Sequence, residues 1–515
     1  MNFDALLGRK IRFMNFLFLL LLFLIVSCKK KDDSIVETSQ ISSDKVLDSI
    51  YLYAQEVYLW NEYLPEYRVF NPQKYNKREN KKLGNYLDEI QGISKYAINS
   101  VTGLAYENNV RSNGRAKYST IINVNEDSGN GETDFGISVS RTKSGTFYIA
   151  WVDHNSPAGE AEIKRGDRVL SINNRLLDSS IASLQYLQEM LQSQFVTMEI
   201  ETDGKNRMVR LGGKPYRQNP VLKTKIIDKG GRKLGYLALK SFAHLKNSQT
   251  ILDAIFGDYA HVGITELILD LRYNSGGYQN TCVYLANSIA GASLAGKLMF
   301  SEVYNKKMQE GEAEILKKQP ILTETNQPVI IDGKIATLFD LDYKIENNRY
   351  YFKKIGALNG IKKITFIVSN TTASASELLI NVLAPYLDVE VLGVAGSISD
   401  FPVVTYGKPV GFFDINIDHY KLYLAMYRME NALGNGNYYD GFSTKKSFLD
   451  NVSVDFGNER DDLITYILGL PPKSLAKNKY HKPSVEIENS MIENERSNET
   501  LEGLVKSFDN VKFKK

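Results

Sequence analysis

The segment 361–393 constrains the fold more than any other part of the chain, because it reads as strand, turn, helix and strand. Ile364–Val368 is a β-branched and aromatic run with the length of a buried strand, and Val389–Leu392 is a second one. Between them, Leu378, Leu379, Val382 and Leu383 recur at helical spacing. The same alternation of predicted strands and helices occurs upstream, at Leu234–Leu239, Ser248–Phe256, Glu266–Leu271 and Gln279–Ala290. This alternation predicts a layered α/β unit over residues 214–470.

A serine lies on the turn of that segment, in the run Thr-Ala-Ser-Ala-Ser-Glu at 372–377. The spacing places Ser374 at the start of a helix, where unpaired N–H groups and the helix dipole favour negative charge. A serine in that position is suited to attack a carbonyl group, because neighbouring N–H groups can hold the resulting oxyanion. Read alone, the run is more typical of a helix cap than of a nucleophile.

The composition excludes several other kinds of site. The net charge is only +3 and no long basic block is interleaved with aromatic residues, so a nucleic-acid partner has little support. The five histidines show no metal-ligand spacing, and the two cysteines are far apart in the sequence. No phosphate-binding or dinucleotide loop occurs. We therefore expect neither a metal nor a cofactor.

The N-terminus resembles a bacterial lipoprotein signal. Basic residues precede the apolar run Phe16–Val26, which is too short to span a bilayer, and Ser27-Cys28 follows it. The resemblance implies removal of residues 1–27, a lipid on the Cys28 thiol, and residues 28–44 as a solvated tether. An uncleaved anchor helix is the alternative. We expect a location in the cell envelope, at the outer membrane of a Gram-negative bacterium, facing either the periplasm or the cell surface.

Two further units precede the α/β unit. Residues 45–130 carry helical patterns near Val46–Trp60 and Leu83–Ile98, which predict a small helical N-terminal domain. Residues 131–213 contain Phe135-Gly136-Ile137-Ser138-Val139, then a Gly-Asp-Arg-Val-Leu-Ser-Ile-Asn run, a helical pattern at Ile181–Leu191, and a hairpin turn at Asp203-Gly204. This order resembles a PDZ domain.

The PDZ resemblance implies a peptide-binding groove. A peptide would add as a strand beside the strand that opens at Phe135, with Ile137, Ser138 and Val139 along it. Its C-terminal carboxylate would bind the N–H groups of Gly136 and Ile137, because Gly136 has no Cβ to block a close approach. The alternative is a PDZ-like module that only packs against its neighbour.

The runs Tyr438-Tyr439-Asp440-Gly441-Phe442 and Asp455-Phe456-Gly457 resemble the closing segment of bacterial lipoprotein members of the carboxyl-terminal-processing (tail-specific) serine proteases. Three other motifs together, behind the PDZ-like unit, resemble that protease family. They are the 372–377 run, Leu-Asp-Leu-Arg-Tyr-Asn-Ser-Gly-Gly at 269–277, and Thr405-Tyr406-Gly407-Lys408. The resemblance implies a multidomain α+β protein with a Clp-protease/crotonase-like catalytic core. It also implies a nucleophile at Ser374 and a general base at Lys408. The oxyanion donors would be the N–H of Ala375 and that of Gly276 or Gly277. Protein or peptide substrates with free C-termini are implied as partners.

The chemistry of a Ser-Lys pair requires an uncharged lysine. Lysine normally titrates near pH 10.4, so burial must lower its pKa by roughly 2–4 units. Lys408 lies in an apolar stretch that includes Val403, Val410 and Phe412, which is suited to this. His244 or His419 could act on Ser374 in its place.

One departure from the family pattern affects the base. Residues 394–404 contain extra loop before Thr405, and an alignment without a gap puts Ser399 at the lysine position. Phe412 stands where a glutamine is common. Two other readings therefore stay open: a catalytically inactive peptide-binding relative, and an enzyme that peptide binding switches on. Residues 471–515 are expected to form a flexible tail, and the sequence does not indicate an oligomeric state.

Overall fold

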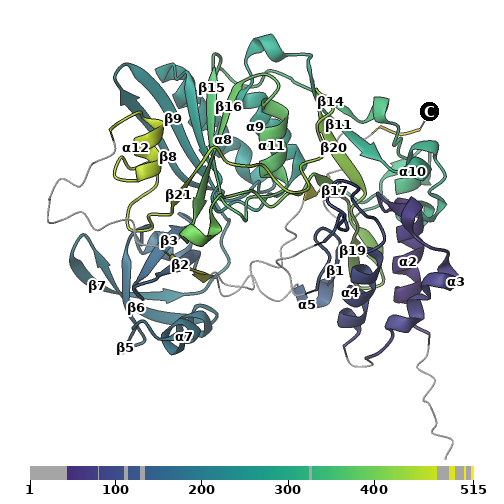
Figure 1. Cartoon of the computed structure of the whole chain (residues 1–515), viewed down its shortest axis with the longest axis horizontal. Helices are drawn as coiled ribbons and strands as arrows, with labels where there is room; N and C mark the ends of the chain where they lie inside the picture. Colours follow the sequence, from purple (N-terminus) through teal and green to yellow (C-terminus); the bar gives the residue numbers. More distant parts are fainter. Residues whose placement is uncertain are drawn as a thin grey trace, which may run out of the picture.

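The computed structural model describes residues 43–78, 81–108, 114–127, 134–323, 327–471, 487–492, 504–505 and 512–514. The proposed signal peptide, Cys28 and nearly all of the tether lie outside these residues. Within them, no helix combines the length and the apolar character that crossing a membrane requires. The molecule mixes helices and sheets in several layers (Figure 1), as the sequence predicts.

A six-stranded sheet forms the centre of the 214–470 unit, in the order β21-β16-β15-β10-β9-β8. All neighbouring strands are parallel except β8, which is antiparallel to β9. The strands are β8 (Val221–Lys229), β9 (Arg232–Leu239), β10 (Glu266–Asp270), β15 (Lys363–Val368), β16 (Asp388–Ala395) and β21 (Lys446–Leu449). Four of them match strands predicted from the sequence, because a strand buried on both faces reads as a continuous apolar run.

Helices cover both faces of this sheet. Leu269 and Phe366 point to one face, in a core that includes residues of α8 (Leu245–Val262), α9 (Gln279–Ile289) and α11 (Ala375–Leu383). Their chain neighbours Ile268 and Ile367 point to the other face, with α12 (Asp462–Ile467). The side chains alternate between faces because successive Cβ atoms of a strand point in opposite directions.

Within the described residues, the N-terminal helices share their hydrophobic core with the α/β unit. Residues of α2 (Lys45–Val57) and α4 (Lys82–Ile93) belong to the same hydrophobic cluster as α9 and α11. In addition, β1 (Thr120–Asn123) pairs with β19 (Tyr420–Tyr423), which pairs in turn with β18 (Ile415–Ile417). The helical region is therefore joined to the α/β unit by a shared core. It is also joined by the pairing of β1 with β19, which lie side by side in Figure 1.

A second sheet of this unit contains the strand that follows Lys408. Its order is β14-β11-β20-β17-β23. The strands are β11 (Leu298–Tyr304), β14 (Arg349–Tyr351), β17 (Val410–Phe412), β20 (Tyr427–Asn431) and β23 (Leu504–Val505). The last of these comes from the C-terminal tail and pairs in parallel with β17.

The PDZ-like unit has a sheet and a core of its own. The strands are β2 (Ile137–Thr142), β3 (Phe147–Val152), β4 (Arg168–Ile172), β5 (Arg175–Leu176), β6 (Phe195–Thr202) and β7 (Lys205–Gly212). Helix α7 spans Ile181–Leu191, the range predicted from the sequence. The predicted hairpin turn has φ of 50° at Asp203 and 78° at Gly204, as a two-residue hairpin with an Asp-Gly turn requires.

The tail differs from the flexible segment expected for residues 471–515. Strand β22 (Ile487–Ile492) pairs with β2, and β23 pairs with β17. The physical reason is that both β2 and β17 offer a free sheet edge, and an edge strand carries unpaired N–H and C=O groups that a further strand can satisfy.

Buried charges join the PDZ-like unit to the core. The Arg165 guanidinium lies 2.6 Å from the Asp450 carboxylate, and Arg272 lies 2.7 Å from the same carboxylate. Arg165 also donates to the Tyr273 hydroxyl at 2.8 Å. These groups are almost fully buried, so each charge needs its partner. Because Arg272 and Tyr273 precede the 274–277 loop, the PDZ-like unit contacts the segment that leads to the predicted oxyanion glycines.

Candidate active site

Ser374 lies at the turn between β15 and α11, directly before the first residue of the helix. Its φ of 59° and ψ of −116° are unusual for a residue with a Cβ, and such backbone strain costs on the order of 1–3 kcal/mol. The side chain is buried, and its Oγ makes no hydrogen bond with any described residue. A strained strand-to-helix turn that presents an uncommitted hydroxyl is the geometry of a nucleophile.

The Glu377 carboxylate connects this helix start to the turn that carries Lys408. It accepts the N–H of Ser374 at 3.0 Å, that of Gly407 at 2.7 Å and that of Lys408 at 2.7 Å. The Thr405 hydroxyl donates to the same group. Burial raises the pKa of Glu377, while the hydrogen bonds from Thr405, Lys408, Gly407 and Ser374 act in the opposite direction. The carboxylate therefore holds two segments together that the sequence separates by the 394–404 loop.

The Lys408 side chain is almost fully buried, with 6% of the residue exposed, and its Nζ lies 5.3 Å from the centre of the Phe412 ring. Val403 and Val410 are also buried, as the apolar pattern predicts. Ser399, the position given by the ungapped alignment, is exposed in a short 3-10 turn and bonds to Ser397 instead. The hydroxyl of Ser374 makes no hydrogen bond to Lys408 in this structure.

The two glycines of the 274–277 loop differ in their roles. A Cβ on Gly276 would lie 2.7 Å from the Ser374 Cβ, so only glycine permits this contact. Its N–H donates to the Asn274 side chain at 2.9 Å and is therefore committed. The bridge to Phe242 uses the Gly276 carbonyl and the Tyr278 N–H. In the trans peptide between Gly276 and Gly277, the C=O and N–H groups point in opposite directions. Because the Gly276 carbonyl faces Phe242, the Gly277 N–H points away from Phe242.

Several supporting residues were not singled out from the sequence. The Ser376 hydroxyl donates to Asn274 Oδ1 at 3.0 Å, which joins the start of α11 to the glycine loop. Tyr118, from the N-terminal region, donates its hydroxyl to the Gly407 carbonyl at 2.7 Å. The position of Glu377 three residues after Ser374 is the spacing of a capping box, and that signal could have identified it. Tyr118 has no comparable signal, because its contact joins residues 289 apart.

The two histidines considered as alternative bases lie in different places. His244 is the N-cap residue directly before α8, and its ring lies 5.0 Å from the ring of Tyr278, the residue after Gly277. His419 lies in the β18–β19 turn, where it pairs with Asp418 at 3.2 Å and its carbonyl accepts the Val124 N–H. Within the described ranges, no three His, Cys, Asp or Glu residues are grouped as a metal site would need.

The structure brings the five predicted groove residues into strand β2 and the loop before it. Gly136 has φ of 70°, and a Cβ there would collide with the Ser156 side chain at 2.0 Å. The Gly136 N–H, expected to bind a peptide carboxylate, donates at 2.8 Å to the side chain of Asp134. Tyr216 donates its hydroxyl to the other oxygen of the same carboxylate, also at 2.8 Å.

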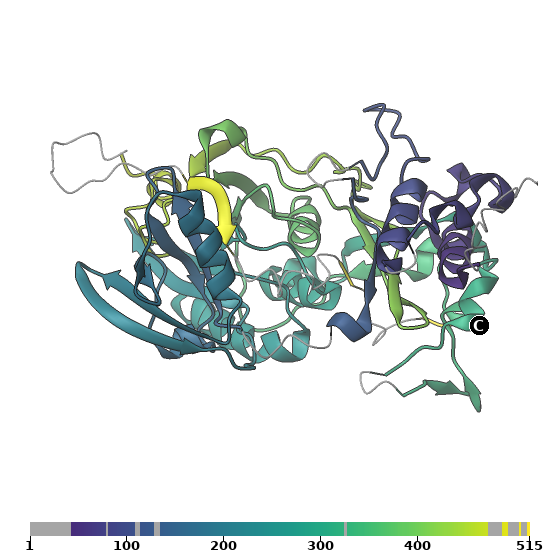
Figure 2. The same cartoon turned by 90° about the horizontal axis from the view of Figure 1, so that it is seen from below.

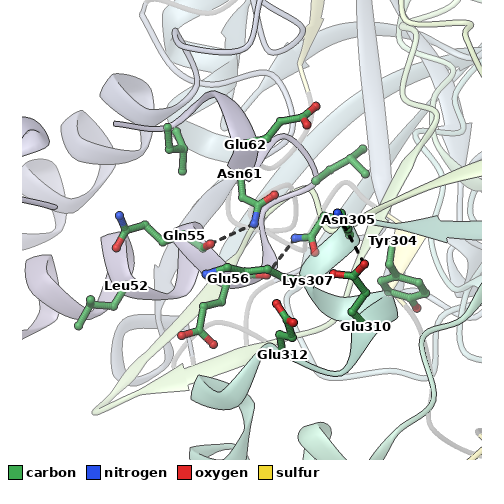
Figure 3. Close-up of a pocket in the computed structure, with 13 residues that line it drawn as sticks. Leu52, Gln55, Glu56, Asn61, Glu62, Tyr304, Asn305, Lys307, Glu310 and Glu312 are labelled. Carbon is green, nitrogen blue, oxygen red and sulfur yellow. Dashed lines mark hydrogen bonds and ion pairs between the residues drawn. The ribbon is translucent and has the colours of Figure 1, made fainter. Parts of the chain in front are cut away.

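Two pockets lie near the N-terminal region. A cavity of about 170 Å³ borders the Thr405–Lys408 turn and is lined in part by Tyr106, Lys117 and Tyr439. A larger cavity of about 680 Å³ lies between α2 and α10 (Lys306–Glu310) (Figure 3). In the wall of this cavity, the Asn305 side chain donates to the Glu56 carbonyl at 2.9 Å, which links the residue before α10 to α2. Neither Ser374 nor Lys408 lines the larger cavity, so it is separate from the candidate active site.

Comparison with known families identifies two segments. Residues 233–397 match the model of peptidase family S41, and residues 148–201 match that of the PDZ domain. The first match includes Ser374 and ends before Lys408. A comparison with curated proteins finds none that matches.

One solved structure shares the fold over most of the chain. A structure described as an S41 protease from Bacteroides fragilis is 21% identical, covers 83% of this chain and 96% of its own, and has a TM-score of 0.53. A photosystem II D1 C-terminal processing protease is 14% identical, covers 82% of this chain and 97% of its own, and has a TM-score of 0.44. At 21% identity, the similarity to the first structure shows a shared fold and nothing more. The TM-score of the second structure is too low for that similarity to support any conclusion.

Proposed function

We propose that this chain, in which residues 233–397 match peptidase family S41 and residues 148–201 match the PDZ domain, is an endopeptidase with Ser374 as nucleophile and Lys408 as general base. The observation that carries this proposal is the Glu377 carboxylate, which accepts N–H groups from both Ser374 and Lys408. Catalytic groups must be held close together before substrate arrives, because positioning contributes a large part of the rate. One buried side chain provides that positioning for both residues.

In the proposed mechanism, the uncharged Lys408 amine takes the proton of the Ser374 hydroxyl as Oγ bonds to the scissile carbonyl carbon. The carbonyl oxygen becomes an oxyanion, and the N–H groups of Ala375 and Gly277 hold it. Each such donor contributes on the order of 3 kcal/mol to stabilising the transition state. Lys408 then returns its proton to the departing amine, and the peptide bond breaks. A water molecule, deprotonated by Lys408, then bonds to the acyl carbon. The ester bond to the Ser374 Oγ breaks, and Lys408 returns the proton to that Oγ.

The assignment of Gly277 over Gly276 follows from the loop geometry. The Gly276 N–H already donates to Asn274, whereas the Gly277 N–H points away from its bridging partner. Catalytic hydrogen bonds are often open in an unliganded site and close in the complex with substrate. In our proposal, the hydrogen bond between Ser374 and Lys408 is absent in this structure and forms when substrate binds.

Substrates in this proposal are protein segments in an extended conformation, recruited by the PDZ groove beside β2. Recognition of free C-termini, expected from the family resemblance, is tested by comparing peptides that end in a carboxylate with the same peptides ending in an amide. A lipid on Cys28 would hold the enzyme at a membrane of the cell envelope. Mass spectrometry of the membrane fraction tests that assignment, since a lipid-modified Cys28 after loss of residues 1–27 has a defined mass.

The test of the active site uses single substitutions in the full chain and an unfolded protein as substrate. Ser374→Ala and Lys408→Met are expected to lower kcat by at least about 10³-fold, because neither variant forms the activated nucleophile. Lys408→Arg should be equally inactive, since a guanidinium does not lose its proton at working pH. Lys334→Met, on the exposed strand β13 (Lys334–Ile335), is the matched control.

Two further variants separate the competing bases. Ser399→Ala should retain full activity. If His244→Gln abolishes hydrolysis while Lys408→Met does not, His244 is the base and the assignment to lysine is wrong.

A second function is favoured by one specific observation, the missing hydrogen bond between Ser374 and Lys408. A chain in which that bond never closes would be a peptide-binding scaffold of the envelope without activity. Such a protein would bind peptides and leave every substrate intact, and Ser374→Ala would then change nothing.

A further inference from the structure

The peptide groove of the PDZ domain already has a strand on its edge, and that strand comes from the same chain. β22 is antiparallel to β2, with Ile492 opposite Val139, Met491 opposite Ser140 and Ile487 opposite Thr142. It is the outermost strand of the sheet β22-β2-β3-β4-β6-β7. Figure 2 shows it as a yellow arrow against the PDZ domain. It occupies the edge on which a peptide ligand would add.

The direction of β22 shows what kind of ligand it is. Ile487, at the start of β22, lies opposite Thr142, and Ile492, at its end, lies opposite Val139. The strand therefore runs toward the loop at Gly136. The chain does not end there but continues to Lys515. The strand is therefore an internal segment, and it brings no terminal carboxylate to the loop.

The loop itself does not need one. The Asp134 carboxylate accepts the Gly136 N–H at 2.8 Å and the Tyr216 hydroxyl at 2.8 Å. A carboxylate of the protein thus bonds to the N–H group expected to bind that of a ligand. A second carboxylate at this point would face the charge of the first at short range, which disfavours it.

The tail also contacts the core through residues that follow β22 in the sequence. Leu504 and Val505 pair with Gly411 and Phe412 of β17. Nearer the end of the described tail, Asp342 donates its backbone N–H to the Lys512 carbonyl at 2.9 Å. Lys514 donates its backbone N–H to the Asp340 carbonyl at 2.8 Å. A segment tethered at both ends has an effective concentration near its site in the millimolar range.

We infer that Ile487–Ile492 is a built-in ligand of the PDZ groove, and that the groove accepts internal extended segments rather than free C-termini. A substrate segment reaches β2 by displacing β22. The inference deepens the proposed function by naming its recruitment step, and it does not require that Ser374 hydrolyse anything.

The experiment measures binding of a labelled peptide with the sequence of residues 485–494, acetylated and amidated at its ends. The protein is the full chain with Ser374→Ala, so that no cleavage intervenes. Met491→Pro, added to it, removes an N–H group from β22 and releases the strand. Asn498→Pro, in neither tail strand, is the control. We expect the Met491→Pro protein to bind the peptide at least about 10-fold more tightly than the parent, and the Asn498→Pro protein to match the parent.

Hydrogen exchange provides an independent readout that does not depend on the peptide. The amides of Ile137–Thr142 that point toward β22, rather than toward β3 on the other side, should exchange at least about 10-fold faster in the Met491→Pro protein. The central sheet should exchange as in the parent, which reports that the protein is folded. Equal peptide affinity in the parent and Met491→Pro proteins, or unchanged exchange in β2, overturns the built-in ligand. Binding of a free-carboxylate peptide 10-fold tighter than its amide overturns the preference for internal segments. Neither result bears on whether Ser374 is catalytic.

Discussion

The carboxylate of Glu377 accepts the backbone N–H of Lys408 at 2.7 Å, across a sequence separation of 31 residues. The same carboxylate accepts the N–H of Ser374, so one side chain sets the relative position of the proposed nucleophile and the segment of the proposed base. Glu377 touches neither a reacting atom nor substrate in our mechanism. It is a positioning residue, and its effect should be separable from that of Lys408.

Glu377→Gln is expected to lower kcat by about 10–100-fold with little change in KM. An amide has one acceptor oxygen, so part of the set of donors from Ser374, Thr405, Gly407 and Lys408 loses its partner, at about 1–3 kcal/mol for each buried donor left unpaired. Urea unfolding measures the stability loss, and steady-state kinetics measure the rate. If kcat/KM of the Glu377→Gln protein falls only as much as its folded fraction, and kcat per folded molecule equals that of the parent, Glu377 has a purely structural role.

The glycine contact with Ser374 predicts a sharp contrast between two alanine substitutions. Gly276→Ala puts a Cβ 2.7 Å from the Ser374 Cβ at φ of 120°, so activity should fall by at least about 100-fold. Gly257→Ala in α8 meets no described atom within 4 Å and should raise the free energy of unfolding by about 0.5–1 kcal/mol with unchanged activity. Peptidase assays and urea unfolding on both proteins check this. Full activity in Gly276→Ala would mean that Ser374 does not work in the position described.

Tyr118→Phe tests the contact between the N-terminal region and the Lys408 turn. Loss of its hydroxyl leaves the buried Gly407 carbonyl without this donor, which costs about 1–3 kcal/mol of folding free energy. We expect a several-fold lower kcat as well, because the turn is less firmly held. Tyr63→Phe, at a half-exposed site in the same region, is the matched control. The expectation is wrong if both variants unfold at the same urea concentration as the parent.

Asp450 predicts an acid-sensitive contact between the PDZ domain and the core. Burial disfavours its charge, but Arg165 and Arg272 outweigh burial and lower the pKa of Asp450 to about 2. A lowered pKa contributes stability at pH values above that of an unfolded aspartate, near 3.9, and the contribution is lost as pH falls from about 4 to 2. This contribution amounts to about 2 kcal/mol, because a shift of one pKa unit corresponds to about 1.4 kcal/mol. Stability measured against pH should therefore fall in that window.

Asp450→Asn should remove this acid dependence and destabilise the protein by about 3–5 kcal/mol at neutral pH, because the buried Arg165 loses its counter-charge. Arg272 keeps its ion pairs with Asp270 and Asp461. Lys223→Met, which breaks the half-exposed pair with Asp455, serves as the control and should cost less than about 1 kcal/mol. A parent and an Asp450→Asn protein with the same slope of stability between pH 4 and 2 would exclude the carboxylate as the source.

The strands and helices were predictable wherever the local pattern was strong. Ile181–Leu191 and the strands around Ser374 matched their predicted ranges closely, because periodicity reports burial of a face directly. The hairpin at Asp203-Gly204 was equally local. The N-terminal region was predicted to be a domain of its own, whereas its helices share the core of the α/β unit. Periodicity identifies an apolar face but not the element that covers it.

The sequence by itself determined the two module families, the serine turn at 372–377 and the glycine loop, because each is a short motif whose spacing carries its chemistry. Tertiary structure alone decided that the Lys408 turn joins Ser374 through Glu377, and that Tyr118 supports it from far along the chain. It also decided that β22 lies on the edge of β2. These are contacts between segments distant in sequence, and no local pattern encodes which partner a buried carboxylate or a free strand edge will find.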